Sequence, residues 1–330
     1  MSKPKILQIL PMYHSEGERI LRQGGEVIRT DQYDISHLCE QVKEVQAIVL
    51  RAPARITAEI IDAAPHLRVI SGAGVGLDNI DVDYASQKNI PVLHAPAINQ
   101  VSTAEHAIAL LLALGKQLLP FHQEMSKGRY HARTLLQTHE LRGKQVALIG
   151  FGRIAQEVAK RLKLGFEMDV RVWVRHFDKD KHGLAEQLGL TVTTDLNDLL
   201  PTADFVSLHV PLTDQTRGMF GREQFQRMKP TAYLINTARG AVVNQQELYQ
   251  ALAKKQIAGA GLDVFDPEPT TDADLPLLSL PNVIVTPHVG GTTVEANYLM
   301  ATAVARNVLK VLAGERPDHL ANPEIFHKFV

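Results

Sequence analysis

The chain has 330 residues, of which 45% are hydrophobic and 22% are charged, a composition too apolar for a disordered protein. Lys and Arg number 35 against 36 Asp and Glu, so the formal net charge of −1 argues against a nucleic-acid-binding surface. The single cysteine, Cys39, excludes an internal disulfide and a CxxC metal or redox motif. At about 100–200 residues per domain, the length predicts two domains.

Neither a targeting segment nor a membrane span is expected. Residues 6–10 are too few for the apolar region of a signal peptide. The longest apolar stretch, residues 107–114, is well short of the roughly 20 residues that a bilayer span requires. We therefore expect a cytoplasmic protein whose partners include neither membrane nor nucleic acid.

Short β-branched runs alternate with longer amphipathic segments, which is the pattern of a parallel sheet covered by helices. The predicted strands are residues 5–10, 47–50, 68–71, 92–94, 145–150, 169–174, 205–209, 233–236, 261–264 and 283–286. The predicted helices include residues 57–64, 102–119, 154–164, 244–255 and 293–312. Thr57 is expected to cap the first of these helices, and Asn244 with Glu247 to form a capping box at the fourth.

A glycine-rich GxGxxA turn follows one of the predicted strands. Gly150 permits the tight turn, Gly152 lets the backbone approach a pyrophosphate, and Ala155 allows the helix to pack closely on the strand. The helix that begins with Arg153 and Ile154 presents free N–H groups and a positive dipole end to the phosphates. A strand, this turn and a helix in that order predict a dinucleotide-binding site.

The choice of dinucleotide depends on the residue that reads the adenosine ribose, at the end of the second strand of the unit. The strand predicted at 169–174 ends without a carboxylate, and Asp169 stands at its beginning, facing away from the ribose. Arg175, with His176, is therefore expected to pair with a 2′-phosphate, which favours NADP(H). Two alternatives stay open: Arg175 as a solvated surface residue, and Asp178 curling back to select NAD(H).

Three polar segments follow later strands, at the edge where ligands collect in an open α/β sheet, and they contain Arg239, Glu268 and His288. The planar guanidinium of Arg239 suits bidentate binding of a carboxylate, and His288 titrates near neutrality, as a proton donor to a carbonyl requires. A Glu268 carboxylate beside His288 raises its pKa and orients its ring. The three types together predict a nicotinamide enzyme acting on a 2-keto acid. Taken singly, each residue has a structural alternative. Arg239 fits a buried ion pair, Glu268 fits a solvated loop, and His288 is one of 14 histidines, most of which are expected to be surface or core residues.

Together these motifs resemble the D-isomer-specific 2-hydroxyacid dehydrogenases, the family of phosphoglycerate dehydrogenase, hydroxypyruvate and glyoxylate reductases and phosphite dehydrogenase. The resemblance covers nearly the whole chain and also includes residues 72–81 and 209–213. It implies an α/β fold of two Rossmann-like domains, a doubly wound parallel-sheet cofactor domain inserted in a flavodoxin-like substrate domain. The substrate-binding domain would comprise residues 1–100 and 292–330, and the NAD(P)-binding domain residues 101–291.

The resemblance also implies roles for individual residues, with no metal among them. Arg239 holds the substrate carboxylate, His288 is the general acid/base and Glu268 is its partner. Cofactor-lining positions are matched by Pro211, Thr216, Thr237 and Asp263, the last near the nicotinamide amide. Substrate-side positions are matched by Gly74, Val75, Gly76, Asn99 and Arg51, of which the glycine loop also reads as an anion-binding nest. Family members are usually homodimers, joined through a helix and arm that match residues 102–142. The apolar run at 107–119 fits such an interface and equally fits packing within one subunit.

Departures from the family's branches narrow the expected substrate. The phosphoglycerate branch has two arginines after its second strand, and here Arg51 matches the first while Pro53 replaces the second. We also expect no regulatory domain, because the chain stops at Val330. The D-lactate branch has an aromatic pair after its catalytic histidine, where this chain has Val289 and Gly290.

The expected reaction is hydride transfer between NAD(P)H and a small 2-keto acid, and hydroxypyruvate or glyoxylate is the substrate expected first. D-3-phosphoglycerate is the alternative substrate. A second class of function stays open, that of the dinucleotide-sensing corepressors that share the fold and retain the same three residues. Cys39 takes no part in the expected chemistry.

Overall fold

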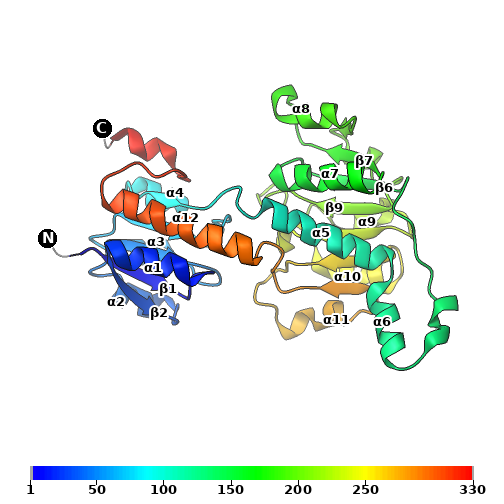
Figure 1. Ribbon diagram of the computed structural model, residues 1–330, viewed down its shortest axis with the longest axis horizontal. Helices are drawn as coiled ribbons and strands as arrows, with labels where there is room; N and C mark the ends of the chain where they lie inside the picture. Colours follow the sequence, from blue (N-terminus) through cyan, green and yellow to red (C-terminus); the bar gives the residue numbers. More distant parts are fainter. Residues whose placement is uncertain (1–2, 329–330) are drawn as a thin grey trace. The chain divides into compact units, whose positions relative to one another are not determined.

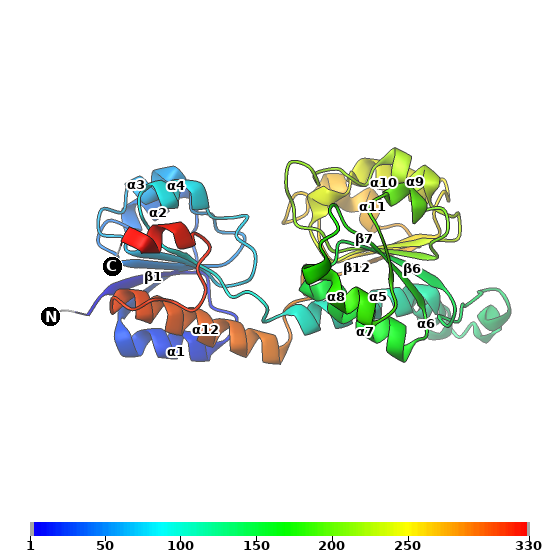
Figure 2. The same cartoon turned by 90° about the horizontal axis from the view of Figure 1, so that it is seen from above.

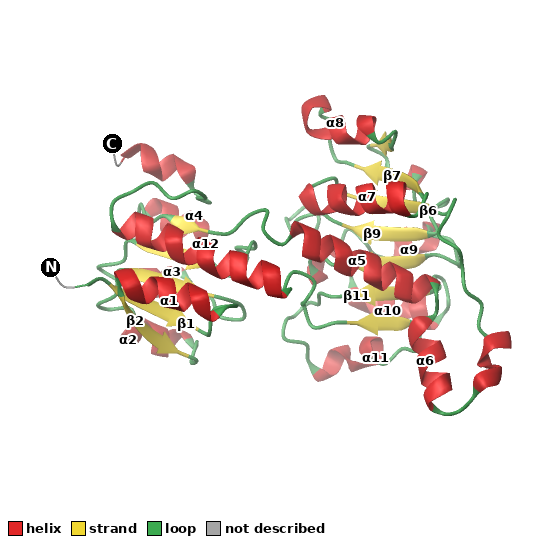
Figure 3. Ribbon diagram, viewed as in Figure 1, coloured by secondary structure: helices red, strands yellow, loops and turns green. Residues whose placement is uncertain are grey.

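The computed structural model describes residues 3–328, except for the side chains of 179–182 and 326–328. The chain divides into two compact units, one of Met1–Asn99 with Thr292–Val330 and one of Gln100–Gly291 (Figure 1). Each unit is a parallel sheet covered by helices, which confirms the predicted α/β class (Figure 3). Within the described part of the chain, no helix combines the length and apolar character needed to cross a bilayer.

The first unit has a five-stranded sheet in the order β2-β1-β3-β4-β5, the flavodoxin-like order. Its strands are β1 (Lys5–Ile9), β2 (Glu26–Thr30), β3 (Ala47–Leu50), β4 (Val69–Gly72) and β5 (Val92–Leu93). Its helices are α1 (Ser15–Gly24), α2 (Ile35–Gln41), α3 (Ala58–Asp62), α4 (Val82–Gln87) and α12 (Val294–Leu312). Helices α1 and α12 cover one face of this sheet, and α2, α3 and α4 cover the other (Figure 2). The apolar residues of α12, including Met300 and Val304, thus complete a core that Ile6 begins near the other end of the chain.

The second unit has a seven-stranded sheet in the order β12-β11-β10-β9-β6-β7-β8. Its strands are β6 (Gln145–Ile149), β7 (Asp169–Trp173), β8 (Thr191–Thr193), β9 (Phe205–Leu208), β10 (Tyr233–Asn236), β11 (Gly259–Leu262) and β12 (Val283–Val285). Its helices are α5 (Gln100–Gly115), α6 (Leu118–Ser126), α7 (Arg153–Gly165), α8 (Lys179–Gln187), α9 (Arg222–Arg227), α10 (Gln245–Ala253) and α11 (Leu275–Leu278). Short 3-10 helices are η1 (Tyr130–Thr134), η2 (Leu196–Asp198), η3 (Gly240–Val242), η4 (Asp272–Asp274) and, in the first unit, η5 (Pro323–Lys328).

Apolar layers on both faces explain why the central strands of this sheet are apolar along their whole length. On one face α5 and α7 pack over the sheet, and on the other α9 and α10 do so (Figure 2). The strand order reverses between β6 and β9, where the chain turns from one half of the sheet to the other. In a doubly wound sheet, the carboxyl ends of the strands at this point form the ligand site.

Every predicted strand is present, with ends that differ by about two residues at most. The prediction missed β2 and β8, each of which lies at one edge of its sheet, although it found β5 and β12 at the opposite edges. Their sequences, EVIRT and TVT, are short or carry charges, because an edge strand is exposed on one side and needs no continuous apolar run. The apolar-run signal therefore detects the interior strands and misses an edge strand whose sequence carries charges or lacks an apolar run.

The predicted helix at 102–119 is wrong only near its end, where the structure has a break between two helices. Helix α5 ends at Gly115, Gln117 adopts a left-handed conformation with φ 52°, and α6 begins at Leu118. The Gln117 side chain donates hydrogen bonds to the hydroxyl of Tyr233 at 3.1 Å and to the carbonyl of Leu114 at 3.4 Å, which stabilises this break. The apolar pattern continues across the break, so it gave no sign of it.

The predicted caps are only partly correct. Thr57 stands at the N-cap of α3, but its buried hydroxyl makes no capping bond. Asn244 caps α10 by accepting the N–H of Glu247 at 3.2 Å. The Glu247 carboxylate accepts the N–H of Arg222 at 2.8 Å, so it ties α10 to α9 instead of closing the predicted capping box.

Candidate active site

Three neighbouring strands of the second unit carry the predicted catalytic residues beyond their carboxyl ends. Arg239 follows β10, Glu268 follows β11 and His288 follows β12. These strands are parallel and adjacent, so their carboxyl ends lie at the same edge of the sheet. The structure therefore brings together side chains that are up to 49 positions apart in the sequence.

His288 and Glu268 form a hydrogen-bonded pair. The Nδ1 atom of His288 lies 2.7 Å from Oε2 of Glu268, and Oε1 of Glu268 accepts the backbone N–H of Phe265 at 2.9 Å. The carboxylate is thus held at both oxygens, and Nδ1 of the ring must carry a proton to donate to it. Since the His288 side chain is 50% exposed, its Nε2 atom is left to exchange a proton with a ligand.

The surroundings raise the pKa of His288 above its ordinary value. The hydrogen bond to Glu268 has the largest effect; burial opposes it, the negative charges of Glu268 and Asp263 add to it, and the positive charge of Arg239 works against it. His288 therefore stays protonated to a higher pH than an isolated histidine.

Substitution Glu268→Gln should move the basic limb of the pH profile for keto-acid reduction to lower pH. If His288 is the predicted proton donor, its protonated form is the one that reduction needs, and the variant replaces the charged acceptor whose hydrogen bond contributes most to the raised pKa of His288. The same pair stabilises the fold below the unfolded pKa of histidine, and that stabilisation is lost as pH rises through the folded pKa. The measurement is kcat/KM against pH, with Glu223→Gln on α9 as the control. An unshifted profile would remove Glu268 from its assigned role.

The backbone at His288 is strained, with φ at 55° in the left-handed region that non-glycine residues seldom adopt. Backbone bonds fix it there, because the N–H of His288 donates to the carbonyl of Asp263 at 2.8 Å. The Asp263 carboxylate also accepts the N–H groups of Val289 at 2.9 Å and Gly290 at 2.8 Å. The turn that presents His288 is therefore fastened to Asp263 from three consecutive residues.

Arg239 is presented by a loop with little freedom. Buried Asn236 accepts the N–H of Ala238 and donates to the carbonyl of Arg239, each at 3.0 Å. A Cβ atom on Gly240 would lie 2.0 Å from the carbonyl carbon of Phe265, so only glycine allows this loop to approach the segment before Glu268. The guanidinium donates through Nη1 to the carbonyl of Ala238 at 2.7 Å.

The glycine turn has the geometry that a pyrophosphate site requires. Gly150 has φ 97°, and a Cβ there would lie 2.7 Å from the carbonyl oxygen of His209. Gly152 is the N-cap of α7, makes no side-chain capping bond, and a Cβ on it would meet nothing within 4 Å. The first N–H groups of α7, from Arg153 and Ile154 onward, are therefore free of a side-chain cap beside open space.

A further feature of this edge also fits a dinucleotide. The hydroxyl of Thr237, just beyond β10, is buried without a hydrogen-bond partner, which is unusual for a buried polar atom and fits a ligand contact. Thr216 is different, because its buried hydroxyl donates to the carbonyl of Pro211 at 2.6 Å and accepts the N–H of Thr213 at 2.8 Å. Thr216 thus shapes the turn that carries Pro211.

Arg175 and His176 are exposed just beyond the carboxyl end of β7. Asp169 lies at the other end of this strand, where its Oδ2 accepts a hydrogen bond from Nε of Arg171 at 3.0 Å. Asp178, the residue that the alternative would use to select NAD(H), is half-buried. No carboxylate therefore belongs to the end of β7 itself, and Arg175 is the first charged residue after it.

The predicted substrate-side residues belong to the first unit. Arg51 follows β3, and the loop with Gly74, Val75 and Gly76 follows β4, the neighbouring strand. The Arg51 guanidinium lies 4.9 Å from the ring centroid of Tyr13, a cation–π contact. The last of these residues, Asn99, ends the first segment of this unit.

Sequence reasoning missed one residue of the active-site edge, His106 on α5. Its Nε2 atom lies 2.9 Å from the hydroxyl of Thr286, which donates to Oδ1 of Asp263 at 2.6 Å. The only sign in the sequence is one histidine that precedes an otherwise apolar helical run.

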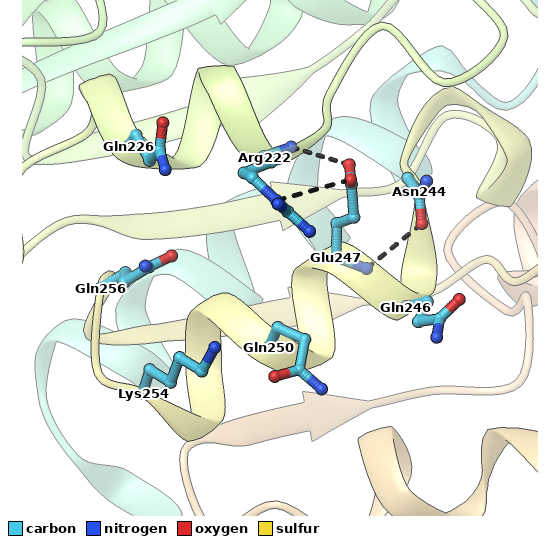
Figure 4. Close-up of a pocket in the computed structure, with 8 residues that line it drawn as sticks. All are labelled: Arg222, Gln226, Asn244, Gln246, Glu247, Gln250, Lys254 and Gln256. Atoms are coloured by element: carbon cyan, nitrogen blue, oxygen red, sulfur yellow. Dashed lines mark hydrogen bonds and ion pairs between the residues drawn. The ribbon is translucent and has the colours of Figure 1, made fainter.

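A polar pocket elsewhere in this unit is unrelated to these residues (Figure 4). It lies over α9 and α10, where Arg222 pairs with Glu247 and Asn244 caps α10. Among the residues described, no group of three or more His, Cys, Asp or Glu is arranged to hold a metal ion.

A doubly wound sheet with a glycine turn after its first strand defines the class of dinucleotide-binding Rossmann domains. The family model for the NAD binding domain of D-isomer specific 2-hydroxyacid dehydrogenases matches residues 108–290. The chain belongs to this family, and the resemblance inferred from the motifs is confirmed.

Relatives of known name agree with this placement. A glyoxylate reductase of Pyrococcus furiosus is 41% identical over 333 residues, covering 98% of this chain and 96% of the relative. A D-3-phosphoglycerate dehydrogenase of Methanocaldococcus jannaschii is 39% identical over 318 residues, covering 96% of this chain. The chain spans 59% of the length of that dehydrogenase and 58% of the one from Archaeoglobus fulgidus.

Solved structures have the same fold. The TT0316 protein from Thermus thermophilus superposes with a TM-score of 0.87 at 34% identity, covering 96% of this chain and 99% of that one. An NADPH-dependent glyoxylate/hydroxypyruvate reductase from Sinorhizobium meliloti, solved with NADP and malonate, superposes with a TM-score of 0.86 at 28% identity, covering 97% of each chain.

Proposed function

We propose that this protein is an NAD(P)-dependent oxidoreductase acting on a small 2-keto acid or its D-2-hydroxy acid. The observation that carries the proposal is the hydrogen-bonded pair of His288 and Glu268 at the sheet edge that also carries Arg239. A proton donor and a cation for a carboxylate are the two groups that such a reaction requires of the protein. Membership of the 2-hydroxyacid dehydrogenase family supports it.

In the reductive direction, protonated His288 donates its Nε2 proton to the carbonyl oxygen of the keto acid. Glu268 keeps the ring oriented and stabilises its positive charge. Arg239 binds the substrate carboxylate through two N–H groups and so aligns the carbonyl carbon. The nicotinamide, when bound, supplies the hydride that reaches this carbon.

Residues of the glycine turn would hold the pyrophosphate of the dinucleotide. Gly150 and Gly152 give the phosphates access to the backbone, and the N–H groups from Arg153 and Ile154 onward would bind them. The unpartnered hydroxyl of Thr237 is a further donor. Further predicted contacts, still proposals, come from Pro211, Thr216 and Asp263.

Among the two dinucleotides, we propose NADP(H). The absence of a carboxylate from the end of β7 and the exposed Arg175 beside it support this choice. The relative from Sinorhizobium meliloti is described as NADPH-dependent, whereas the family model is named for NAD binding.

The variant Arg175→Ala should lose roughly tenfold in kcat/KM for NADPH, the value of one charge-assisted contact at an exposed site, and keep its kcat/KM for NADH. The neutral 2′-hydroxyl of NADH offers Arg175 no comparable charge. The control is Arg171→Ala. Arg171 is a cation on β7 that pairs with Asp169, so its removal should leave kcat/KM for both dinucleotides unchanged. A strong preference of the native protein for NADH would contradict the proposal.

The proposed substrates are hydroxypyruvate and glyoxylate, with D-3-phosphoglycerate as the alternative. Relatives named glyoxylate reductase and D-3-phosphoglycerate dehydrogenase support the two equally. Pro53 in place of a second arginine favours the substrates without phosphate. Further residues proposed to bind the substrate are Gly74, Val75, Gly76, Asn99 and Arg51. A panel of keto acids and 3-phosphoglycerate, assayed with both dinucleotides, decides between them by kcat/KM.

We further propose a cytoplasmic homodimer. Residues of α5 up to Leu114 pack in the core of the second unit, so core packing explains the first part of the apolar run at 107–119. Large apolar side chains become exposed beyond it: Leu118, Leu119, Met125, Tyr130 and Leu135. Several such residues on one arm support an interface with a second copy. The relatives named above are reductases and dehydrogenases, so nothing in them favours the corepressor class.

A further inference from the structure

His106 lies on α5 and reaches the segment that follows β12. Its Nε2 atom is 2.9 Å from Oγ1 of Thr286 and 3.5 Å from Oδ1 of Asp263. It also packs against the backbone of Gly290, where a Cβ atom would lie 3.2 Å from Cδ2 of the His106 ring. The imidazole therefore fills the space beside the turn that carries His288.

The direction of the hydrogen bonds can be worked out from the groups involved. Asp263 is only 2% exposed; burial raises the pKa of its carboxyl group, but hydrogen bonds from the side chains and N–H groups around it outweigh burial and lower that pKa overall. An ionised carboxylate only accepts, so the single hydroxyl hydrogen of Thr286 goes to Asp263. The Thr286 oxygen must then accept from His106, whose Nε2 carries a hydrogen.

The hydrogen bonds from His106 through Thr286 and Asp263 lead to the strained turn that carries His288. The Oδ1 and Oδ2 atoms of Asp263 accept the N–H groups of Val289 and Gly290, the two residues after His288. Rotation of the carboxylate would break one or both of these bonds. The hydroxyl of Thr286, itself held by His106, opposes that rotation because it also bonds Oδ1.

We propose that His106 is a positioning residue for His288. Its Nε2–H, relayed through the Thr286 hydroxyl, fixes the Asp263 carboxylate and so the left-handed turn that presents His288. No contact between His106 and the His288 ring is needed for this role. The effect on turnover rests on the proposed function, whereas the effect on the turn does not.

The test compares variants that break the relay with variants that keep its donors. His106→Leu and Thr286→Val remove one link each, while His106→Gln and Thr286→Ser retain a side-chain donor. Thr202→Val is the matched control, because it removes a hydroxyl that accepts from Gln145 before β9, away from the carboxyl ends of the strands. Each full-length variant is checked by its melting temperature and then assayed for amide hydrogen exchange and kinetics.

In the two variants that break the relay, the amides of Val289 and Gly290 should exchange roughly tenfold faster than in the native protein. The kcat for hydroxypyruvate reduction should fall by roughly 10- to 100-fold, because misplacement of a catalytic group costs turnover. The KM should change by less than about threefold, since no substrate contact is removed. His106→Gln, Thr286→Ser and Thr202→Val should stay close to the native values.

Unchanged exchange at Val289 and Gly290 in both His106→Leu and Thr286→Val would overturn the proposal. An equal fall in kcat in His106→Leu and His106→Gln would also overturn it, because that result would mean that His106 acts through packing alone. A native protein that reduces none of the acids would refute the proposed function, and the exchange rates would still decide the role of His106. If His106→Leu does not fold, the comparison of Thr286→Val with Thr286→Ser decides it.

Discussion

Replacing His288 with Asn should lower kcat for keto-acid reduction by roughly 10²–10⁴-fold, the usual contribution of a general acid. Asn lacks a group that titrates near neutrality, so it cannot supply the proton that forms the product hydroxyl. Asn also tolerates the left-handed φ of 55° better than most residues, which separates loss of the proton donor from collapse of the turn. The measurement is single-turnover reduction at saturating keto acid.

Binding of the dinucleotide is the internal control for this variant. Its dissociation constant should be unchanged, since the glycine turn follows β6 and His288 follows β12. A second control is His66→Asn, which changes an exposed histidine between α3 and β4 and should keep native turnover. Native turnover in His288→Asn would show that the proton comes from another group.

Replacing Arg239 with Ala should raise KM for the keto acid and lower kcat together. Two charge-assisted hydrogen bonds to a carboxylate contribute about 3 kcal/mol, so kcat/KM should fall by roughly 10²-fold or more. Both constants change because the same contact binds the substrate and aligns its carbonyl group. Arg239→Lys should recover only part of the loss, because Lys restores the charge without the planar fork.

The control for Arg239 is Arg227→Ala on α9, where an exposed arginine pairs with Glu223 one helical turn earlier. This variant should keep native constants, since surface ion pairs of this kind contribute little. Steady-state kinetics with hydroxypyruvate and with a substrate analogue that lacks the carboxylate completes the test. If Arg239→Ala lowers kcat/KM by the same factor for both compounds, Arg239 does not bind the carboxylate.

The interior of both sheets was predictable because strands buried on two faces are apolar throughout. The edge strands β2 and β8 were not, since their exposed sides require no such run. The end of α5 at Gly115 was also missed, because the break at Gln117 depends on a hydrogen bond to Tyr233 from a distant part of the chain. Contacts between distant segments leave no periodic signal near the residue they affect.

The candidate site shows the same division. Residue type and position after a strand were enough to select Arg239, Glu268 and His288, because parallel strands bring the loops at their carboxyl ends to one edge of the sheet. The bond between His288 and Glu268 was expected from their chemistry and is present at 2.7 Å. The strained backbone of His288 and the relay from His106 were not predictable, since the first depends on bonds to Asp263 and the second on a contact between α5 and Thr286.

The most direct test of the central proposal is the stereochemistry of the product. The purified protein, supplied with hydroxypyruvate and NADPH, should form D-glycerate with one NADPH consumed for each molecule formed. Chromatography on a chiral column separates the two enantiomers of glycerate. Formation of L-glycerate, or no consumption of NADPH or NADH with any acid of the panel, would contradict the assignment as a D-2-hydroxyacid oxidoreductase.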